Sequence, residues 1–214
     1  MKKIVLLGAS GHGKVCGEIA ELEGYEEIVF LDDNEELADC GGYPVRGRIS
    51  DFKMYLQEGA DFFVSIGDAD IRRRIQEEIV SAGGNTVALV HPKAVVGKSV
   101  FMGEGTVVMA GAVINPCAEI GRGCIVNTAA TVDHDCVVGN FCHIAVGAHL
   151  CGAVNVGEQT WVGAGATVSN NIEICGGCMI GAGAVVIKDI KDAGTYVGVP
   201  AEKRNYENFS TYEY

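Results

Sequence analysis

The histidine–carboxylate pair His134-Asp135 has the clearest capacity for chemistry in this sequence. It interrupts a stretch of aliphatic, small and glycine residues. Histidine is the side chain whose ordinary pKa lies nearest neutral pH, and an adjacent carboxylate can raise its basicity and fix its tautomer. The pair therefore favours a general base. A histidine on the surface or at a subunit interface is an equally simple interpretation, and both stay open at this point.

A second candidate site lies near the N-terminus, where an apolar stretch runs directly into Gly8-Ala9-Ser10-Gly11-His12-Gly13. A helical pattern follows, and then a second apolar stretch that ends in Asp32-Asp33. Glycines in such a turn let backbone N–H groups approach a phosphate, and the carboxylates can bind a ribose or a base. The glycine spacing differs from the usual dinucleotide fingerprint, so a tight turn followed by solvated acids remains an alternative.

His134 belongs to an uninterrupted six-residue repeat that runs from Val96 to about Lys191, in which every sixth residue from Val96 to Val186 is aliphatic or Met. Four residues later there is usually a small residue. This period fits neither a helix nor an alternating strand, and it predicts a parallel β-helix with three hexads per coil and about five coils. Gly or Asn often follows the aliphatic residue, and we expect them there because they tolerate backbone angles that branched residues avoid.

The two patterns predict two domains: a Rossmann-like α/β domain over residues 1–90 and a solenoid over residues 91–214. In the first, we expect a buried strand over residues 61–67 and a helix that starts near Ile71. The helix carries three consecutive arginines, residues 72–74, which we expect on a solvated face with Glu77 and Glu78.

Composition narrows the classes of function. A net charge of −12 over 214 residues speaks against a general nucleic-acid or membrane-surface binder. We expect no signal peptide, and no apolar run reaches membrane-spanning length. Four of the nine cysteines occupy the small slot of the repeat, which predicts reduced, structural thiols and a cytoplasmic protein.

Several motifs together resemble those of the bacterial nucleotide-sugar N-acetyltransferases of the bacillosamine and sialic-acid-associated group. They are Gly8-Ala9-Ser10-Gly11-His12-Gly13, Phe30-Leu31-Asp32-Asp33, Ser65-Ile66-Gly67-Asp68-Ala69-Asp70-Ile71-Arg72, Asn127-Thr128, Asp133-His134-Asp135 and His143. The resemblance implies a left-handed β-helix, a homotrimer with active sites between subunits, and acetyl-CoA as co-substrate. It also implies a UDP-4-amino-4,6-dideoxy-sugar as acceptor, acetylated at its 4-amino group with His134 as general base. The family has Glu where this chain has Asp135.

The same resemblance assigns roles to further residues. For the nucleotide-sugar these are Ser10, Gly11, His12, Asp32, Asp33 and Gly67. For acetyl-CoA they are His143, Gly152, Ala164 and Ala182, and Lys188 adds local positive charge for the CoA phosphates. Asn127 matches a position near the reacting amine. Gly152 follows His134 by three hexads, one coil further along the same edge, so we expect its N–H to stabilise the developing oxyanion.

Three alternatives remain. The acceptor could be a GDP-4-amino sugar or a sialic acid that is O-acetylated. The chain could be a non-catalytic nucleotide-sugar sensor. A zinc hydro-lyase on the same solenoid would require histidines from several subunits, because His143 and His149 are one hexad apart and occupy successive faces. We therefore expect no metal.

Overall fold

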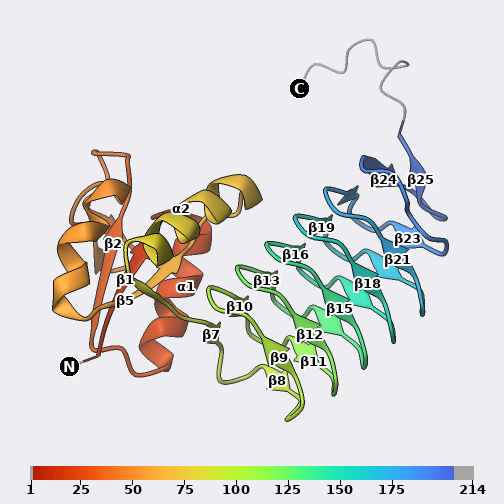
Figure 1. The fold of residues 1–214 in the computed structure, drawn as a ribbon, viewed down its shortest axis with the longest axis horizontal. Helices are drawn as coiled ribbons and strands as arrows, with labels where there is room; N and C mark the ends of the chain where they lie inside the picture. The colour runs from red at the N-terminus through yellow and green to blue at the C-terminus, as the bar shows by residue number, and fades with distance from the viewer. Residues whose placement is uncertain (1, 205–214) are drawn as a thin grey trace.

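The structure, a computed structural model, describes residues 2–204. The last ten residues of the expected range 91–214 lie outside the described residues. Figure 1 shows an α/β domain followed by a stack of β coils. The α/β domain contains β1 (Lys3–Leu7), α1 (Gly11–Leu22), β2 (Glu27–Leu31), β3 (Asp39–Cys40), β4 (Tyr43–Pro44), the 3-10 helix η1 (Ile49–Glu58), β5 (Asp61–Val64), α2 (Ala69–Ser81) and β6 (Asn85–Thr86). Its parallel sheet has the order β2-β1-β5-β6, so the Rossmann-like arrangement is confirmed.

The coils form a three-sided solenoid, and each side is a sheet that we call a wall. The first wall contains β7 (Leu89–Val90), β10 (Val107–Val108), β13 (Ile125–Val126), β16 (His143–Ile144), β19 (Trp161–Val162), β22 (Met179–Ile180), β24 (Thr195–Val197) and β25 (Glu202–Lys203). The second wall contains β8 (Val95–Val96), β11 (Val113–Ile114), β14 (Thr131–Val132), β17 (His149–Leu150), β20 (Thr167–Val168) and β23 (Val185–Val186). The third wall contains β9 (Phe101–Met102), β12 (Glu119–Ile120), β15 (Val137–Val138), β18 (Asn155–Val156) and β21 (Glu173–Ile174).

The register of the walls confirms three hexads per coil. Val126 pairs with Ile144, and Val132 pairs with Leu150, in each case three hexads further on. The solenoid has about six coils rather than five, because β7 and β24 extend the repeat at its two ends. The aliphatic and small slots both face the interior, where Cys124 and Cys142 are fully buried among the other members of the core. All nine cysteines are free thiols.

The glycines that follow the aliphatic residues occur there for a different physical reason from the one expected. Gly139 has no left-handed φ, but a Cβ there would come within 2.6 Å of the backbone nitrogen of Glu158 on the next coil. At this position glycine is needed because the neighbouring coil approaches closely, so the expectation of special backbone angles was wrong. The left-handed angles occur two residues later in the hexad, for example at Asp135, with a φ of 58°.

The expectation of a solvated arginine face is wrong for Arg72. This side chain is fully buried and donates hydrogen bonds to the carbonyl oxygens of Gly123 and Phe141 in the solenoid. Arg73 follows the expectation, with Nε 3.2 Å from an oxygen of Glu77 one helical turn on. Helix α2 therefore packs one of its sides against a corner of the solenoid.

Candidate active site

His134 and Asp135 lie at the corner between the second and third walls. His134 Nδ1 is 2.7 Å from Asp135 Oδ2, so the carboxylate reaches the ring although it is one methylene shorter than Glu. This hydrogen bond, followed by the nearby charge of Asp133, raises the pKa of His134 above its ordinary value. Asp133 in turn accepts hydrogen bonds from Asn115 Nδ2 and from the backbone N–H of His134, both at 2.7 Å. The imidazole is therefore oriented, more basic than usual and 57% exposed.

Gly152 lies beneath the His134 ring, one coil further along. A Cβ on Gly152 would come within 2.7 Å of His134 Nε2, so only glycine leaves room for the ring in this position. Ala153 N–H donates to the His134 carbonyl oxygen at 2.9 Å, which fixes the stacking of the two coils. Within residues 2–204, the Gly152 N–H has no hydrogen-bond partner. The Gly152 N–H can therefore donate a hydrogen bond to a ligand carbonyl oxygen that approaches it when the His134 ring moves aside.

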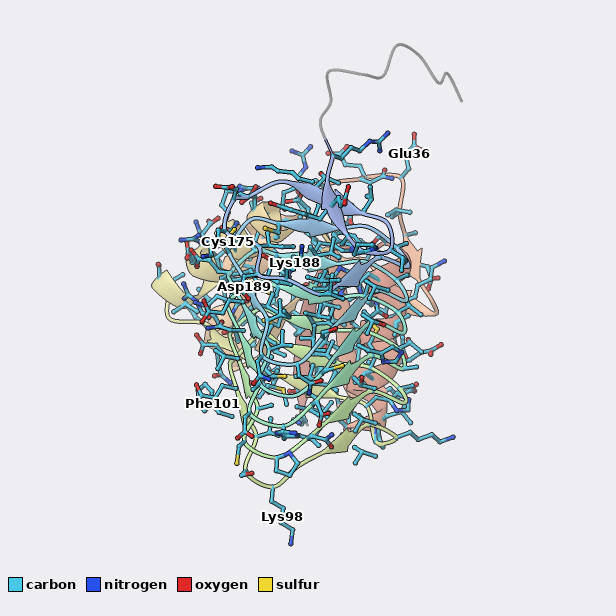
Figure 2. All side chains as sticks on the ribbon, turned by 90° about the vertical axis from the view of Figure 1, so that its right-hand side faces the viewer. Glu36, Lys98, Phe101, Cys175, Lys188 and Asp189 are labelled. Carbon is cyan, nitrogen blue, oxygen red and sulfur yellow. The ribbon has the colours of Figure 1, made fainter. Side chains whose placement is uncertain are left out.

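Lys188 lies in the same column of corner residues as His134 and Gly152, because whole coils of three hexads separate the three positions. With coils about 4.8 Å apart, its backbone lies about 14 Å from that of His134 along the solenoid. The side chain is exposed and is not part of the hollows described below. Figure 2 shows Lys188 beside Asp189 in the view from the C-terminal end of the solenoid.

His143 and Asn127 form a second polar group, on the first wall. Asn127 Nδ2 lies 3.0 Å from His143 Nε2, and the His143 ring packs on Trp161 with ring centroids 4.4 Å apart. Burial, with a smaller contribution from the charge of Arg72, lowers the pKa of His143 to about 3. If Nε2 accepts from the Asn127 amide, the proton is on Nδ1, which is buried and has no partner among the described residues. His143 is therefore a neutral histidine with one unused polar atom.

Two neighbouring hollows of about 440 and 450 Å³ share His143 and Trp161. The first extends along the first wall over Ala164 and Ala182, next to Asn127. The second lies between the same wall and the start of α2, where Gly67 lines it. The structure thus brings Asn127, His143, Ala164, Ala182 and Gly67 to one face. Trp161 was not among the predicted site residues, although it lies one coil after His143 in the same outward slot.

The remaining nucleotide-sugar candidates lie around the turn between β1 and α1. Ser10 and Gly11 are located at the start of α1, and burial lowers the pKa of His12 to about 4. Asp32 accepts hydrogen bonds from the N–H of Ala9 at 2.7 Å and of Asn34 at 2.9 Å. Asp32 therefore holds the glycine-rich turn itself.

Asp33 extends this region toward η1. Its Oδ1 accepts a hydrogen bond from the N–H of Ile49 at 3.1 Å. Asp32 and Asp33 both line a larger hollow of about 690 Å³ beside α2.

The His134–Asp135 pair and the Asn127–His143 group are separated within one chain. The corner that carries His134 is opposite the first wall, which carries His143 and the hollows. In the part of the chain that the structure describes, no cluster of three or more His, Cys, Asp or Glu side chains could hold a metal ion. No helix among these residues is long and apolar enough to cross a bilayer.

An α/β domain followed by a six-residue β-solenoid, with a histidine–carboxylate pair at a solenoid corner, defines the class of the hexapeptide-repeat acyltransferases. Residues 3–79 match the PglD N-terminal domain family. The acetyltransferase domain of PglB from Neisseria gonorrhoeae, solved in complex with acetyl coenzyme A, is 42% identical with a TM-score of 0.91 over 95% of this chain and 99% of that chain. PerB from Caulobacter crescentus, solved with CoA and GDP-perosamine, is 36% identical with a TM-score of 0.91 over 96% and 98% of the two chains.

A curated relative, the UDP-N-acetylbacillosamine N-acetyltransferase of Bacillus subtilis, is 35% identical over 114 residues, which are 51% of this chain and 52% of the relative. The match thus spans about half the length of this relative, and 22% of a second one, an uncharacterized mimivirus protein. The solved structures are matched over nearly their whole length. The chain belongs to the PglD-like family of nucleotide-sugar acetyltransferases.

Proposed function

We propose that this protein is an acetyl-CoA-dependent N-acetyltransferase that acts on the 4-amino group of a UDP-4-amino-4,6-dideoxy-sugar. In this proposal residues 1–90 bind the nucleotide-sugar, and residues 91–214 bind acetyl-CoA and carry His134 as the general base. The observation that carries the proposal is the geometry of His134, whose Nδ1 is held by Asp135 and whose Nε2 lies over Gly152. The family relationship supports the choice of substrates.

The chemistry requires a base and an oxyanion donor. His134 Nε2 takes a proton from the sugar's 4-ammonium group, and the resulting amine attacks the thioester carbonyl carbon. Negative charge then collects on the carbonyl oxygen, where the Gly152 N–H is the donor in this proposal; loss of such a donor costs about 2.7–4 kcal/mol. The C–S bond breaks, the proton on His134 passes to the departing thiolate, and the second proton that the nitrogen must lose to become an amide is released to solvent. A positioned base of this kind contributes about 10²–10⁴-fold to the rate.

We further propose that the enzyme is a homotrimer in which each active site uses two subunits. Within one chain, His134 lies at the corner opposite the first wall. A complete site therefore needs His134 of one copy and the first wall of a neighbouring copy. Contacts between unlike surfaces form a closed ring when the rotation closes. His134 of one copy would then face Asn127, His143, Ala164 and Ala182 of the next, and Lys188 would lie near the CoA phosphates.

The nucleotide carrier has a second candidate. The Caulobacter relative was solved with GDP-perosamine at 36% identity over nearly the whole chain, which favours a GDP-4-amino sugar as the alternative acceptor. Release of free thiol from acetyl-CoA, measured in parallel with a UDP-4-amino sugar, a GDP-4-amino sugar and free sialic acid, separates these cases. We expect thiol release with the UDP-sugar. Release only with another acceptor would change the acceptor, and no release with any of them would favour the sensor.

The role of His134 has its own test. We expect His134→Ala to lower kcat by about 10²–10⁴-fold while leaving the affinity for acetyl-CoA nearly intact. Wild-type turnover by this variant would exclude His134 as the base. The nine free cysteines and the use of acetyl-CoA support a cytoplasmic location for this reaction.

A further inference from the structure

Arg72 is the largest fully buried side chain in the described part of the protein, and it joins the two domains. On the solenoid side, Nε donates to the Gly123 carbonyl oxygen at 2.7 Å and Nη2 donates to the Phe141 carbonyl oxygen at 2.9 Å. On the side of the α/β domain, Nη1 donates to the carbonyl oxygens of Ile66 at 2.9 Å and Gly67 at 2.7 Å. One guanidinium group thus holds four backbone carbonyls, two from each domain.

Packing alone does not account for this arginine. Burial of a charged group is unfavourable unless its donors find partners, and an apolar side chain of similar volume would fill the same space without that cost. No carboxylate lies among its hydrogen-bond partners within residues 2–204. The planar fork of arginine is instead matched to four fixed carbonyl positions, a geometry that the single ammonium group of lysine cannot reproduce.

The position of Arg72 follows from the way α2 lies along the corner between the third and first walls. One helical turn later, Gln76 Nε2 donates to the Glu104 carbonyl oxygen at 3.1 Å, one coil earlier in the solenoid. In the other direction, Asp70 Oδ1 accepts a hydrogen bond from Gln159 Nε2 at 2.5 Å, one coil later. Side chains from about two helical turns, residues 70–76, therefore reach four successive coils of the solenoid.

The two carbonyls that Arg72 holds in the α/β domain belong to the segment between β5 and α2. Gly67 in this segment lines the hollow that also contains His143 and Trp161. On the solenoid side, Phe141 lies two residues before His143 in the same coil. Arg72 therefore bridges the two backbone segments that border this hollow.

We infer that Arg72 is a positioning residue for the nucleotide-sugar, because it fixes the Ile66–Gly67 segment at a set distance from the coil that carries His143. This inference rests on the proposed function, in which Gly67 and the rest of the α/β domain bind the nucleotide-sugar; we take the side of the hollow that Gly67 lines as part of that acceptor site. The acetyl-CoA hollow over Ala164 and Ala182 extends away from this joint, toward the corner between the first and second walls. His143 and Trp161 line both hollows, but only the nucleotide-sugar hollow includes the segment that Arg72 holds, so the effect of Arg72 should fall mainly on the nucleotide-sugar.

The test compares Arg72→Lys with Gln76→Leu, measuring KM for each substrate, kcat and thermal stability. Gln76 is buried on the same helix and contacts the same corner, but within residues 2–204 its side chain makes no hydrogen bond to the Ile66–Gly67 segment. We expect Arg72→Lys to raise KM for the nucleotide-sugar about tenfold or more while KM for acetyl-CoA stays within about twofold. We expect Gln76→Leu to leave both KM values near those of the wild type, even if its melting temperature falls as much as that of Arg72→Lys.

An unchanged nucleotide-sugar KM in Arg72→Lys would overturn the inference, as would an equal rise in Gln76→Leu. If Arg72→Lys does not fold, Arg72→Gln, which keeps a neutral donor, is judged by the same comparison. The wild-type protein separates the two proposals, because turnover by the wild type tests the proposed function and the ratio of variant to wild type tests Arg72. If the wild type turns over no acceptor, the affinities of wild type and variant for UDP and GDP are measured by calorimetry. A weaker nucleotide affinity in the Arg72 variant is then the expected result, in place of the higher KM. Absence of both turnover and nucleotide binding would overturn both proposals.

Discussion

Gly152→Ala is the substitution that most directly tests the proposed role of His134 and Gly152. The added Cβ would lie 2.7 Å from His134 Nε2 and 2.8 Å from Cε1, whereas ordinary contact begins near 3.4 Å. The ring must therefore move by about 0.7 Å or rotate away, and a misplacement of about 1 Å at a reacting group can cost up to about 10²-fold in rate. We expect kcat to fall about 10- to 100-fold.

The same substitution should have little effect on folding. The His134 side chain is 57% exposed, so it can move into solvent without disturbing the core. Apart from the ring, the nearest atom to the added Cβ is Asn170 Nδ2 at 3.3 Å, so we expect the free energy of unfolding to fall by about 1 kcal/mol or less. Alanine also keeps the backbone N–H, so the proposed oxyanion donor is still present. Any loss of activity would therefore come from the position of the imidazole.

The assay is thiol release from acetyl-CoA by four proteins: the wild type, Gly152→Ala, His134→Ala and the double variant. If Gly152 acts by making room for the ring, the double variant should be no slower than His134→Ala, because groups that act as a unit are not additive. Two results would refute the reasoning. One is wild-type kcat in Gly152→Ala, and the other is a double variant whose loss is the product of the two single losses.

Three further predictions concern the base, the coils and the assembly. Asp135→Asn should shift the acidic limb of kcat/KM to lower pH, because His134 is active when deprotonated and its pKa, raised mainly by Asp135, should fall; a pH profile checks this. Gly139→Ala should destabilise the protein by about 1–3 kcal/mol in a denaturant titration, because its Cβ would meet the Glu158 backbone nitrogen at 2.6 Å and the coils cannot separate. Coexpression of His134→Ala with Ala164→Trp, which fills the hollow of the first wall, should restore about one quarter of wild-type activity if each site uses two subunits in a randomly mixed ring. Activity no higher than that of either variant alone would count against a shared site.

The sequence predicted the solenoid well because each interior position repeats at a fixed interval. The period of six placed Cys124 and Cys142 in the interior and Gly152 next to His134, and the structure confirms both placements. The reason for the glycines could not be read from the same pattern. A left-handed φ and a close approach between coils both select glycine, and only the three-dimensional spacing at Gly139 distinguishes the two.

The joint between the domains could not be predicted from the sequence for a related reason. Arg72, Arg73 and the acidic residues after them have the spacing of a solvated, ion-paired helix face, and Arg73 does pair with Glu77. The hydrogen-bond partners of Arg72 are backbone carbonyls. Every residue carries one, so no residue type in the sequence identifies these partners. The contact between Asn127 and His143 likewise depends on where the coil turns, because the two residues do not occupy equivalent slots of the repeat.

The separation of His134 from the first wall follows from the way a solenoid is built. Interior slots must be aliphatic or small, so polar chemistry is confined to the outward faces and the corners. A corner can hold a residue such as Asp135, with its φ of 58°, because the turn already requires a left-handed angle there. In a three-sided coil, each corner faces away from the opposite wall, so a base at one corner and a hollow on that wall cannot meet within one chain. If His134 and the hollow belong to one active site, as we propose, that site needs a neighbouring copy, and activity should fall on dilution below the dissociation constant of the assembly.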